Sequence, residues 1–385
     1  MSAITSARVG KDKLSELVAK LEVNLDGEPA FVIVMASPAI SLAETMGLLG
    51  TRFPNARIIG TSTSGEFNEK GDGKESVAAL AVTGDYKVHV GLGRDLAASP
   101  EAAVREALAG QPASLVGYPH RTGIILLDPL AGHGEEASLL VAAELGDQPL
   151  VGGAAGDDLA MTKTIVGHDG VVESDAIVVM SIFSRKPLGI GVKHGHRTLT
   201  PDSYRVTRAD GSVVLEVDGR PAWDVWRDAT RTRATALGLD PDTQPGAFLL
   251  RFEAGLRVSG EYKVRAPLAP KPGGGILFAT AMDEGTVFQI MESDVSSQVA
   301  SAVEAARSAR EALGGAAVAG AIVFDCICRK LILGDEYAPM VRAISTELGG
   351  VPLAGFETYG EIAMNSGDMS GFHNTTTVVL AFPEA

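Results

Sequence analysis

A short pattern of an apolar run, two glycines and an acidic residue occurs three times in the chain. In each copy a strand-like run reaches a glycine, a second glycine follows within the next five positions, and a carboxylate stands directly after it. The copies are Gly60–Glu66, Gly152–Asp157 and Gly355–Glu361. A motif that recurs in similar surroundings indicates a fold assembled from copies of one supersecondary unit.

The sequence before each glycine motif repeats as well. Strand-like runs begin at Phe31, Gly123 and Gly320, and each is followed by a helix-like segment before its motif. A strand, a helix and a second strand therefore form the repeated unit, although the spacing is too irregular for a solenoid. We predict an α/β fold in which mixed β-sheets are flanked by helices and divided between two tandem domains.

Composition narrows the class of protein. A chain of 385 residues exceeds the usual size of one core, so two domains are expected. The formal net charge of −15 argues against binding nucleic acid, which requires clustered Lys and Arg. No run approaches the ~20 apolar residues of a membrane span, and no leader peptide is recognisable. With Cys326 and Cys328 as the only cysteines, we expect a cytoplasmic protein with reduced thiols.

Local patterns divide the chain further. Leu14, Leu17, Val18 and Leu21 share one face of an amphipathic helix over residues 11–23. We expect an N-terminal helix within residues 1–27, one domain over 28–220 and a second over 221–385. The turn-like step Asp218–Ala222 marks the boundary. A loop over 235–246, a strand over 247–252 and a long helix over 293–313 are predicted in the second domain.

Seven short motifs together resemble those of the FIST family. Four resemble its C-terminal domain: Phe324–Gly334, Pro352–Phe356, Tyr359–Ile362 and Phe372–Thr376. Three resemble its N-terminal domain: Gly60–Glu66, Val151–Asp157 and Val217–Ala222. The resemblance covers about residues 28 to 380, and several ordered motifs are far more specific than one glycine pattern.

The resemblance implies a function. FIST proteins are described as intracellular sensors of signal transduction that bind small ligands such as amino acids. Some relatives sense nitric oxide through haem and regulate a histidine kinase. By this resemblance, the chain is expected to bind a small molecule and to act on a separate signalling protein, without catalysis and without a cofactor.

Polar residues around the third glycine motif suggest where such a ligand binds. Arg329 would clamp a carboxylate while Glu361 accepts an ammonium group, the complement that an amino acid requires. His373, Asn374 and Tyr359, with the glycines Gly355 and Gly360, complete the predicted site. The alternative is an internal salt bridge between Arg329 and Glu361, with Asn374 capping a turn.

Two other kinds of chemistry stay open at this point. His194 and His196 are two residues apart, so one of them is a candidate haem ligand. Against this, a histidine in a loop is more often solvated. A zinc site is also disfavoured, because no third ligand is evident. Cys326 with His373 would make a thiol-dependent hydrolase or transferase, although a thiol inside an apolar strand is usually inert.

The remaining candidates have structural interpretations. Glu66 stands where a phosphate-binding loop has its Lys, which disfavours nucleotide binding. Asp128 and His133 would make an acid–base pair, but an Asp before Pro is typical of a turn. Trp223 and Trp226 are spaced for packing on a helix.

Overall fold

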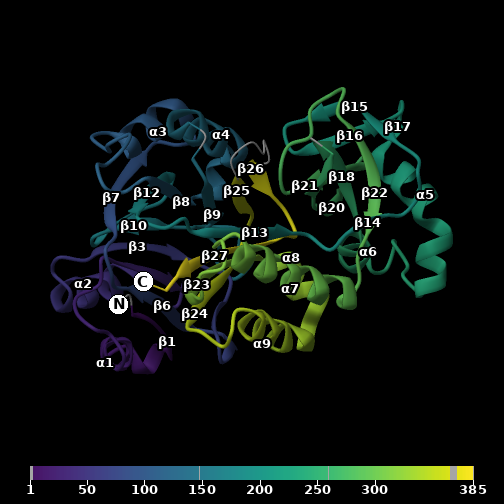
Figure 1. Cartoon of the computed structure of the whole chain (residues 1–385). Helices are drawn as coiled ribbons and strands as arrows, with labels where there is room; N and C mark the ends of the chain where they lie inside the picture. The colour runs from purple at the N-terminus through teal and green to yellow at the C-terminus, as the bar shows by residue number, and fades with distance from the viewer. Residues whose placement is uncertain (1–2, 147, 259, 365–370, 385) are drawn as a thin grey trace.

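The computed structural model of the chain describes residues 3–146, 148–258, 260–364 and 371–384. Figure 1 shows two parts. The body is formed by the segments 4–193 and 295–383, and the lobe by the segment 197–292 between them. Both ends of the chain therefore belong to the body.

The body contains three strand–helix–strand units, each with a parallel strand pair. The first comprises β2 (Phe31–Ala36), α2 (Leu42–Arg52) and β3 (Arg57–Ser62). The second comprises β8 (His120–Leu127), η2 (Pro129–Ala131), α4 (Gly134–Leu145) and β9 (Leu150–Ala154). The third comprises β23 (Val318–Cys326), α8 (Ile327–Leu333), η3 (Gly334–Glu336), α9 (Tyr337–Glu347) and β24 (Leu353–Thr358). The α/β prediction built on repeated units is confirmed.

Each parallel pair lies inside a six-stranded mixed sheet. The first sheet adds β1 (Ile4–Gly10), β6 (Ser76–Val82), β10 (Val166–His168) and β11 (Val171–Glu173). The second adds β7 (Lys87–Arg94), β12 (Ala176–Ser184), β25 (Glu361–Met364) and β26 (Gly371–His373). The third adds β4 (Glu66–Asn68), β5 (Gly71–Gly73), β13 (Gly189–Lys193) and β27 (Thr377–Pro383).

The terminal strand pair of each sheet comes from a different unit. The pair that follows β3 joins the third sheet, the pair that follows β9 joins the first, and the pair that follows β24 joins the second. The exchange is cyclic, so each unit completes a sheet that another unit began. The three units consequently depend on one another for their hydrogen bonds.

The glycine motifs are the corners at which the chain leaves its own sheet. Three backbone hydrogen bonds link them in a ring: Ser64 N to Glu357 O (3.2 Å), Gly156 N to Ser62 O (2.9 Å) and Tyr359 N to Ala154 O (3.2 Å). A methyl group at Gly156 would lie 2.4 Å from Ser64 Oγ, so the corners meet closely enough to require glycine.

The inner faces of the three sheets share one core, which includes Phe31, Ile124, Met180, Phe324 and Leu380. Helices pack against the outer faces. They are α1 (Glu16–Glu22) and α2 on the first sheet, α3 (Pro100–Leu108) and α4 on the second, and α7 (Val295–Glu311) and α9 on the third. Layers of helix outside sheet bury the apolar face of both.

The lobe is a nine-stranded antiparallel arrangement with two helices against it. The strands are β14 (Arg197–Thr198), β15 (Tyr204–Asp210), β16 (Val213–Val217), β17 (Arg220–Pro221), β18 (Phe252–Val258), β19 (Glu261–Arg265), β20 (Pro267–Lys271), β21 (Gly275–Phe278) and β22 (Val287–Glu292). The helices are α5 (Ala222–Leu237) and α6 (Pro245–Arg251). Trp226 of α5 stacks on Phe288, as its helical spacing predicts.

Several local predictions need correction. Residues 245–251 form helix α6 rather than a strand, because Pro245 opens a helix and the short apolar run suits either structure. Helix α5 extends to Leu237, into the predicted loop. Strand β1 precedes α1 in the N-terminal segment, where only the helix was expected. Cys328 belongs to α8, so the two cysteines do not share a strand.

The step Asp218–Ala222, predicted to separate two domains, lies inside the lobe. Strand β16 comes before this step. It pairs with β17, inside the step, and with β21, which follows it in the chain. The body in turn takes strands from both sides of this step. The structural division of the chain thus follows the body and the lobe, whereas the sequence pattern divides it near residue 220.

Candidate functional site

A cleft of about 790 Å³ lies between the body and the lobe. The body contributes η2, the start of α4, Tyr359 from the turn after β24, and Phe372 from β26. The lobe contributes Ser212 and residues 279–281 and 283. A concave surface formed by two parts of one chain is the usual setting of a small-molecule site.

The rim of the cleft carries strong charges. Glu135 of α4 binds two cations of β19, Lys263 Nζ at 2.5 Å and Arg265 Nη2 at 2.5 Å. Burial lowers the pKa of both cations, and the carboxylate of Glu135 opposes that shift. Glu136 accepts from His133 Nδ1 at 2.9 Å. The two ion pairs of Glu135 hold α4 against the lobe, and Asp283 adds a further carboxylate to the lining.

Tyr359 connects the cleft to the second glycine motif. Its hydroxyl donates to Asp157 Oδ1 at 2.6 Å and accepts from the amide of Leu159 at 2.7 Å. Burial and the hydrogen bond to Asp157 raise the pKa of Tyr359 to about 12. Partial burial would raise the pKa of Asp157, but the hydrogen bonds from Tyr359 and from the amides of residues 161–163 lower it. The phenol is therefore neutral and the carboxylate is charged at neutral pH.

Three other predicted residues lie next to the cleft. Gly360 packs under the ring of Phe372, where an added methyl group would lie 2.1 Å from a ring carbon. Asn374 Oδ1 accepts from the amide of Ala266 (3.2 Å) and from the hydroxyl of Thr280 (3.3 Å), which lines the cleft. His373 is buried beside them, and burial together with Lys263 and Arg265 lowers its pKa to about 3.

Arg329 and Glu361 do not line the cleft. Arg329 is fully buried in α8, where its Nε donates to Asp325 Oδ1 at 2.8 Å and its other nitrogens contact Gln298 and Ser301. Glu361 is also fully buried and accepts from Thr358 and from the amide of Thr376. The arginine pairs with Asp325 and not with Glu361, so the alternative internal salt bridge between Arg329 and Glu361 is not formed.

Gly355 lies inside β24. Its neighbours there are Phe67 of β4 and the carbonyl of Val323, each 2.4 Å from where a methyl group would stand. Gly355 thus permits the pairing of β24 with the exchanged strand β4 and contacts no part of the cleft.

Comparison with known proteins gives this arrangement a family. The FIST N domain matches residues 30–220, and the FIST C domain matches residues 222–364. The chain belongs to the FIST family. FIST domains are associated with sensors of signal transduction.

Relatives of this FIST chain occur in archaea and bacteria. An uncharacterized protein of Methanocaldococcus jannaschii is 26% identical over 284 residues, which are 67% of this chain and 52% of that protein. An uncharacterized protein of Mycobacterium tuberculosis is 26% identical over 290 residues, 71% of this chain and 72% of that protein. The FIST chain thus spans about half the length of the archaeal relative.

His194 and His196 form part of a packed polar cluster under the lobe. His196 Nδ1 lies 3.0 Å from the carbonyl of His194, and the His196 amide donates to His194 Nδ1 at 2.9 Å. Burial lowers the pKa of His194 to about 4 and lowers the pKa of His196 well below its ordinary value. The His196 side chain is fully buried against Glu253, so it has no open face for a haem, whereas His194 is only partly buried. Among the described residues, no group of three His, Cys, Asp or Glu side chains is placed to hold a metal ion.

The thiol candidates are similarly enclosed. Burial raises the pKa of the Cys326 thiol well above its ordinary value, the reverse of what a nucleophile needs. Within the described ranges, no hydrogen bond joins Cys326 to His373. Asp128 accepts from the amides of Leu130 (2.9 Å) and Asp175 (2.6 Å), as a turn residue does, and is not paired with His133.

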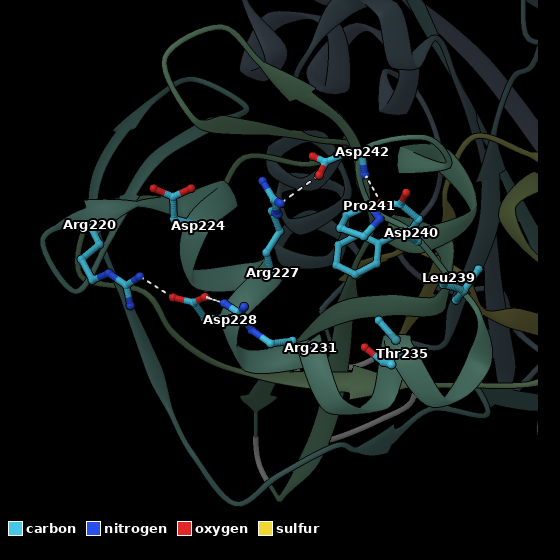
Figure 2. Close-up of a pocket in the computed structure, with 12 residues that line it drawn as sticks. Arg220, Asp224, Arg227, Asp228, Arg231, Thr235, Leu239, Asp240, Pro241 and Asp242 are labelled. Carbon is cyan, nitrogen blue, oxygen red and sulfur yellow. Dashed lines mark hydrogen bonds and ion pairs between the residues drawn. The ribbon is translucent and has the colours of Figure 1, made fainter.

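A second cavity of about 410 Å³ lies over α5 of the lobe (Figure 2). Its arginines are already paired: Arg227 with Asp242 at 2.9 Å, and Arg220 and Arg231 with Asp228. A charged ligand would have to displace these partners, which makes the cavity a weaker candidate than the cleft. In the part of the chain that the structure describes, no helix combines the length and the apolar character needed to cross a membrane.

The sequence did not indicate Asp157, Glu135, Thr280 or the two cations of β19 as parts of the site. Asp157 had a signal, since it is the carboxylate of the second glycine motif. The others come from segments more than 100 residues apart, for example Glu135 and Arg265, which are separated by 130 residues. No local pattern marks such residues.

Proposed function

We propose that this FIST chain is a sensory protein whose small ligand binds in the cleft between body and lobe. The observation that carries the proposal is that one cleft is lined by both parts of the chain, with Tyr359 among its lining residues. A ligand in such a place contacts both parts at once. It therefore shifts any equilibrium between their arrangements by its difference in affinity for them.

An amino acid or a related metabolite is the ligand class that we favour. The carboxylates of Glu136 and Asp283 would accept hydrogen bonds from an ammonium group. The hydroxyl of Thr280 would exchange its 3.3 Å hydrogen bond to Asn374 for one to a ligand carboxylate. The family association with signal transduction supports a second step, in which the chain acts on a separate protein such as a histidine kinase.

A thermal-shift screen of amino acids and related metabolites tests the proposal. A ligand at a hundredfold excess over its dissociation constant stabilises the native state by about 2.7 kcal/mol, which raises Tm measurably. We expect Asp283→Asn and Thr280→Val to weaken the shift, and Arg231→Ala, in the other cavity, to leave it unchanged. A ligand that shifts all of these variants equally binds somewhere other than the cleft.

We further propose that sensing needs no haem, because the His196 side chain is fully buried and the partly buried His194 packs against it. The absorption spectrum of the protein mixed with haemin tests this. We expect no Soret shift above that of free haemin. A shift in the wild type that is lost in His194→Ala or His196→Ala would overturn the proposal.

A further inference from the structure

Residues 158–163 form an exposed segment that is held by hydrogen bonds to the carboxylate of Asp157. This carboxylate accepts from the amides of Met161 (2.9 Å), Thr162 (2.7 Å) and Lys163 (2.9 Å). Asp157 itself is buried, whereas all six residues of the segment are exposed. One side chain thus determines the conformation of a surface segment that has few other contacts.

The backbone of the segment is unusual. Asp158, Leu159 and Met161 have φ values of 55°, 64° and 52°, in the left-handed region that Leu and Met rarely adopt. Such a conformation persists only while the surroundings impose it. Leu159 and Met161 are also half exposed, at 49% and 53%. The segment therefore displays apolar side chains in a conformation that depends on its tether.

Tyr359 completes the tether and also lines the cleft. Its hydroxyl bridges Asp157 Oδ1 and the Leu159 amide, so its position sets both ends of the first turn of the segment. Beyond residue 163 the chain enters β10, the strand that crosses to the first sheet. A movement of Tyr359 would accordingly change the conformation of the exposed segment 158–163, which its ring does not touch.

We propose that Tyr359 couples occupation of the cleft to the conformation of residues 158–163. This inference rests on the proposed function, because the cleft has to be the place that a ligand fills. A ligand that moves the phenol breaks the bridge to Leu159 and releases the left-handed turn. The exposed side chains of Leu159 and Met161 then change position.

The test fills the cleft covalently, so that it does not depend on finding the natural ligand. Ala281, an exposed residue of the lining, is replaced in Ala281→Cys and modified with N-phenylmaleimide. The native thiols of Cys326 and Cys328 are buried and will not compete. Hydrogen exchange of the amides of residues 161–163 is then compared before and after modification, with mass spectrometry to verify the adduct.

We expect the adduct to accelerate exchange of these amides by about tenfold, the effect of losing one hydrogen bond from a local opening equilibrium. In the Tyr359→Phe background, exchange should already be fast and should not respond to the adduct. The control Thr235→Cys, modified in the cavity over α5, should leave the segment unchanged. Circular dichroism shows whether each variant is folded.

Unchanged exchange with a fully formed adduct would overturn the coupling, as would an equal response in the Tyr359→Phe background. The proposed function fails separately. If no metabolite gives a thermal shift but the adduct still loosens the segment through Tyr359, the coupling stands and the assignment of a small natural ligand falls.

Discussion

The carboxylate of Glu253 faces the imidazole of His196 with 3.6 Å between Oε2 and Nε2, and neither side chain is exposed. Glu253 belongs to β18 of the lobe, whereas His196 lies where the chain passes from the body into the lobe. The other carboxylate oxygen of Glu253 accepts from Thr375 of the body at 2.9 Å. This pair therefore joins the two parts of the chain that form the cleft.

The Glu253 carboxyl should make the protein less stable at alkaline pH. Burial raises its pKa to about 8, so the folded state holds a proton that the unfolded chain loses near its ordinary pKa of about 4.3. Its contribution is complete below the unfolded pKa and falls by at most roughly 1.4 kcal/mol per pH unit until pH passes the folded value. Urea unfolding across pH 5 to 9 measures this slope.

The pKa shift of His196 changes stability with pH in the opposite direction. Burial lowers its pKa, so its neutral form favours the folded state, and stability falls as the pH drops below about 6.5. The two effects oppose each other in acid, and the loss from Glu253 should dominate from about pH 6.5 to 8. We expect Glu253→Gln to make the slope in this window shallower without abolishing it, because burial raises the pKa of Glu357 to about 8 as well. Glu261→Gln, an exposed control, should retain it; equal slopes in both variants would contradict the assignment.

Gly360→Ala should destabilise the protein, because Gly360, in the turn after β24, has a φ of 157° and packs against Phe372. Strained backbone and overpacking each cost roughly 1 to 3 kcal/mol. Gly47→Ala is the matched control, since Gly47 lies in α2 with free space around it. Alanine in a helix interior should stabilise the protein by roughly 0.5 to 1 kcal/mol. Urea midpoints that move equally in both variants would contradict the claim that the backbone conformation and close packing at Gly360 require glycine.

Arg329→Met should unfold the body more easily, because it leaves the carboxylate of Asp325 buried and unpaired. Asp325 is fully buried and has Thr377 Oγ1 as its other donor, at 2.5 Å. Removing one partner of a buried ion pair costs roughly 3 to 5 kcal/mol. Arg208→Met, which breaks the exposed pair with Glu216, should cause no measurable change. A normal urea midpoint for Arg329→Met would show that the buried pair contributes little to stability.

The repeated units were predictable from sequence because each carries its own local pattern of strand, helix and glycine corner. The cyclic exchange of strand pairs was not. It depends on pairings such as Gly355 with Phe67, between residues almost 300 positions apart, and strand periodicity says nothing about the partner. The boundary predicted at Asp218–Ala222 coincides with the point where the two FIST domains meet, at residues 220 and 222. The sequence did not indicate that the lobe continues across it, because a tight turn inside a hairpin and a short linker between domains use the same residues.

Part of the predicted site lies at the candidate cleft, next to the third glycine motif. Tyr359 lines the cleft, and Asn374 contacts Thr280 at its edge. Arg329 was expected at a strand end. Instead α8 begins directly after β23 and turns the arginine back onto Asp325, four residues earlier. The first turn of a helix after a strand cannot be located from an apolar run alone, so the sequence overestimated how many polar residues converge.

Iodoacetamide labelling gives the last prediction, which concerns thiol chemistry. Cys326 and Cys328 are 3% and 6% exposed, and burial raises the thiol pKa of Cys326. Since the thiolate is the reacting species, neither residue should be alkylated in the native protein, and both should react fully in urea. Ala281→Cys, exposed in the cleft, is the positive control. Rapid labelling of native Cys326 would show a thiolate accessible to substrate, and a thiol-dependent enzyme would then replace the sensor as the better account of the protein.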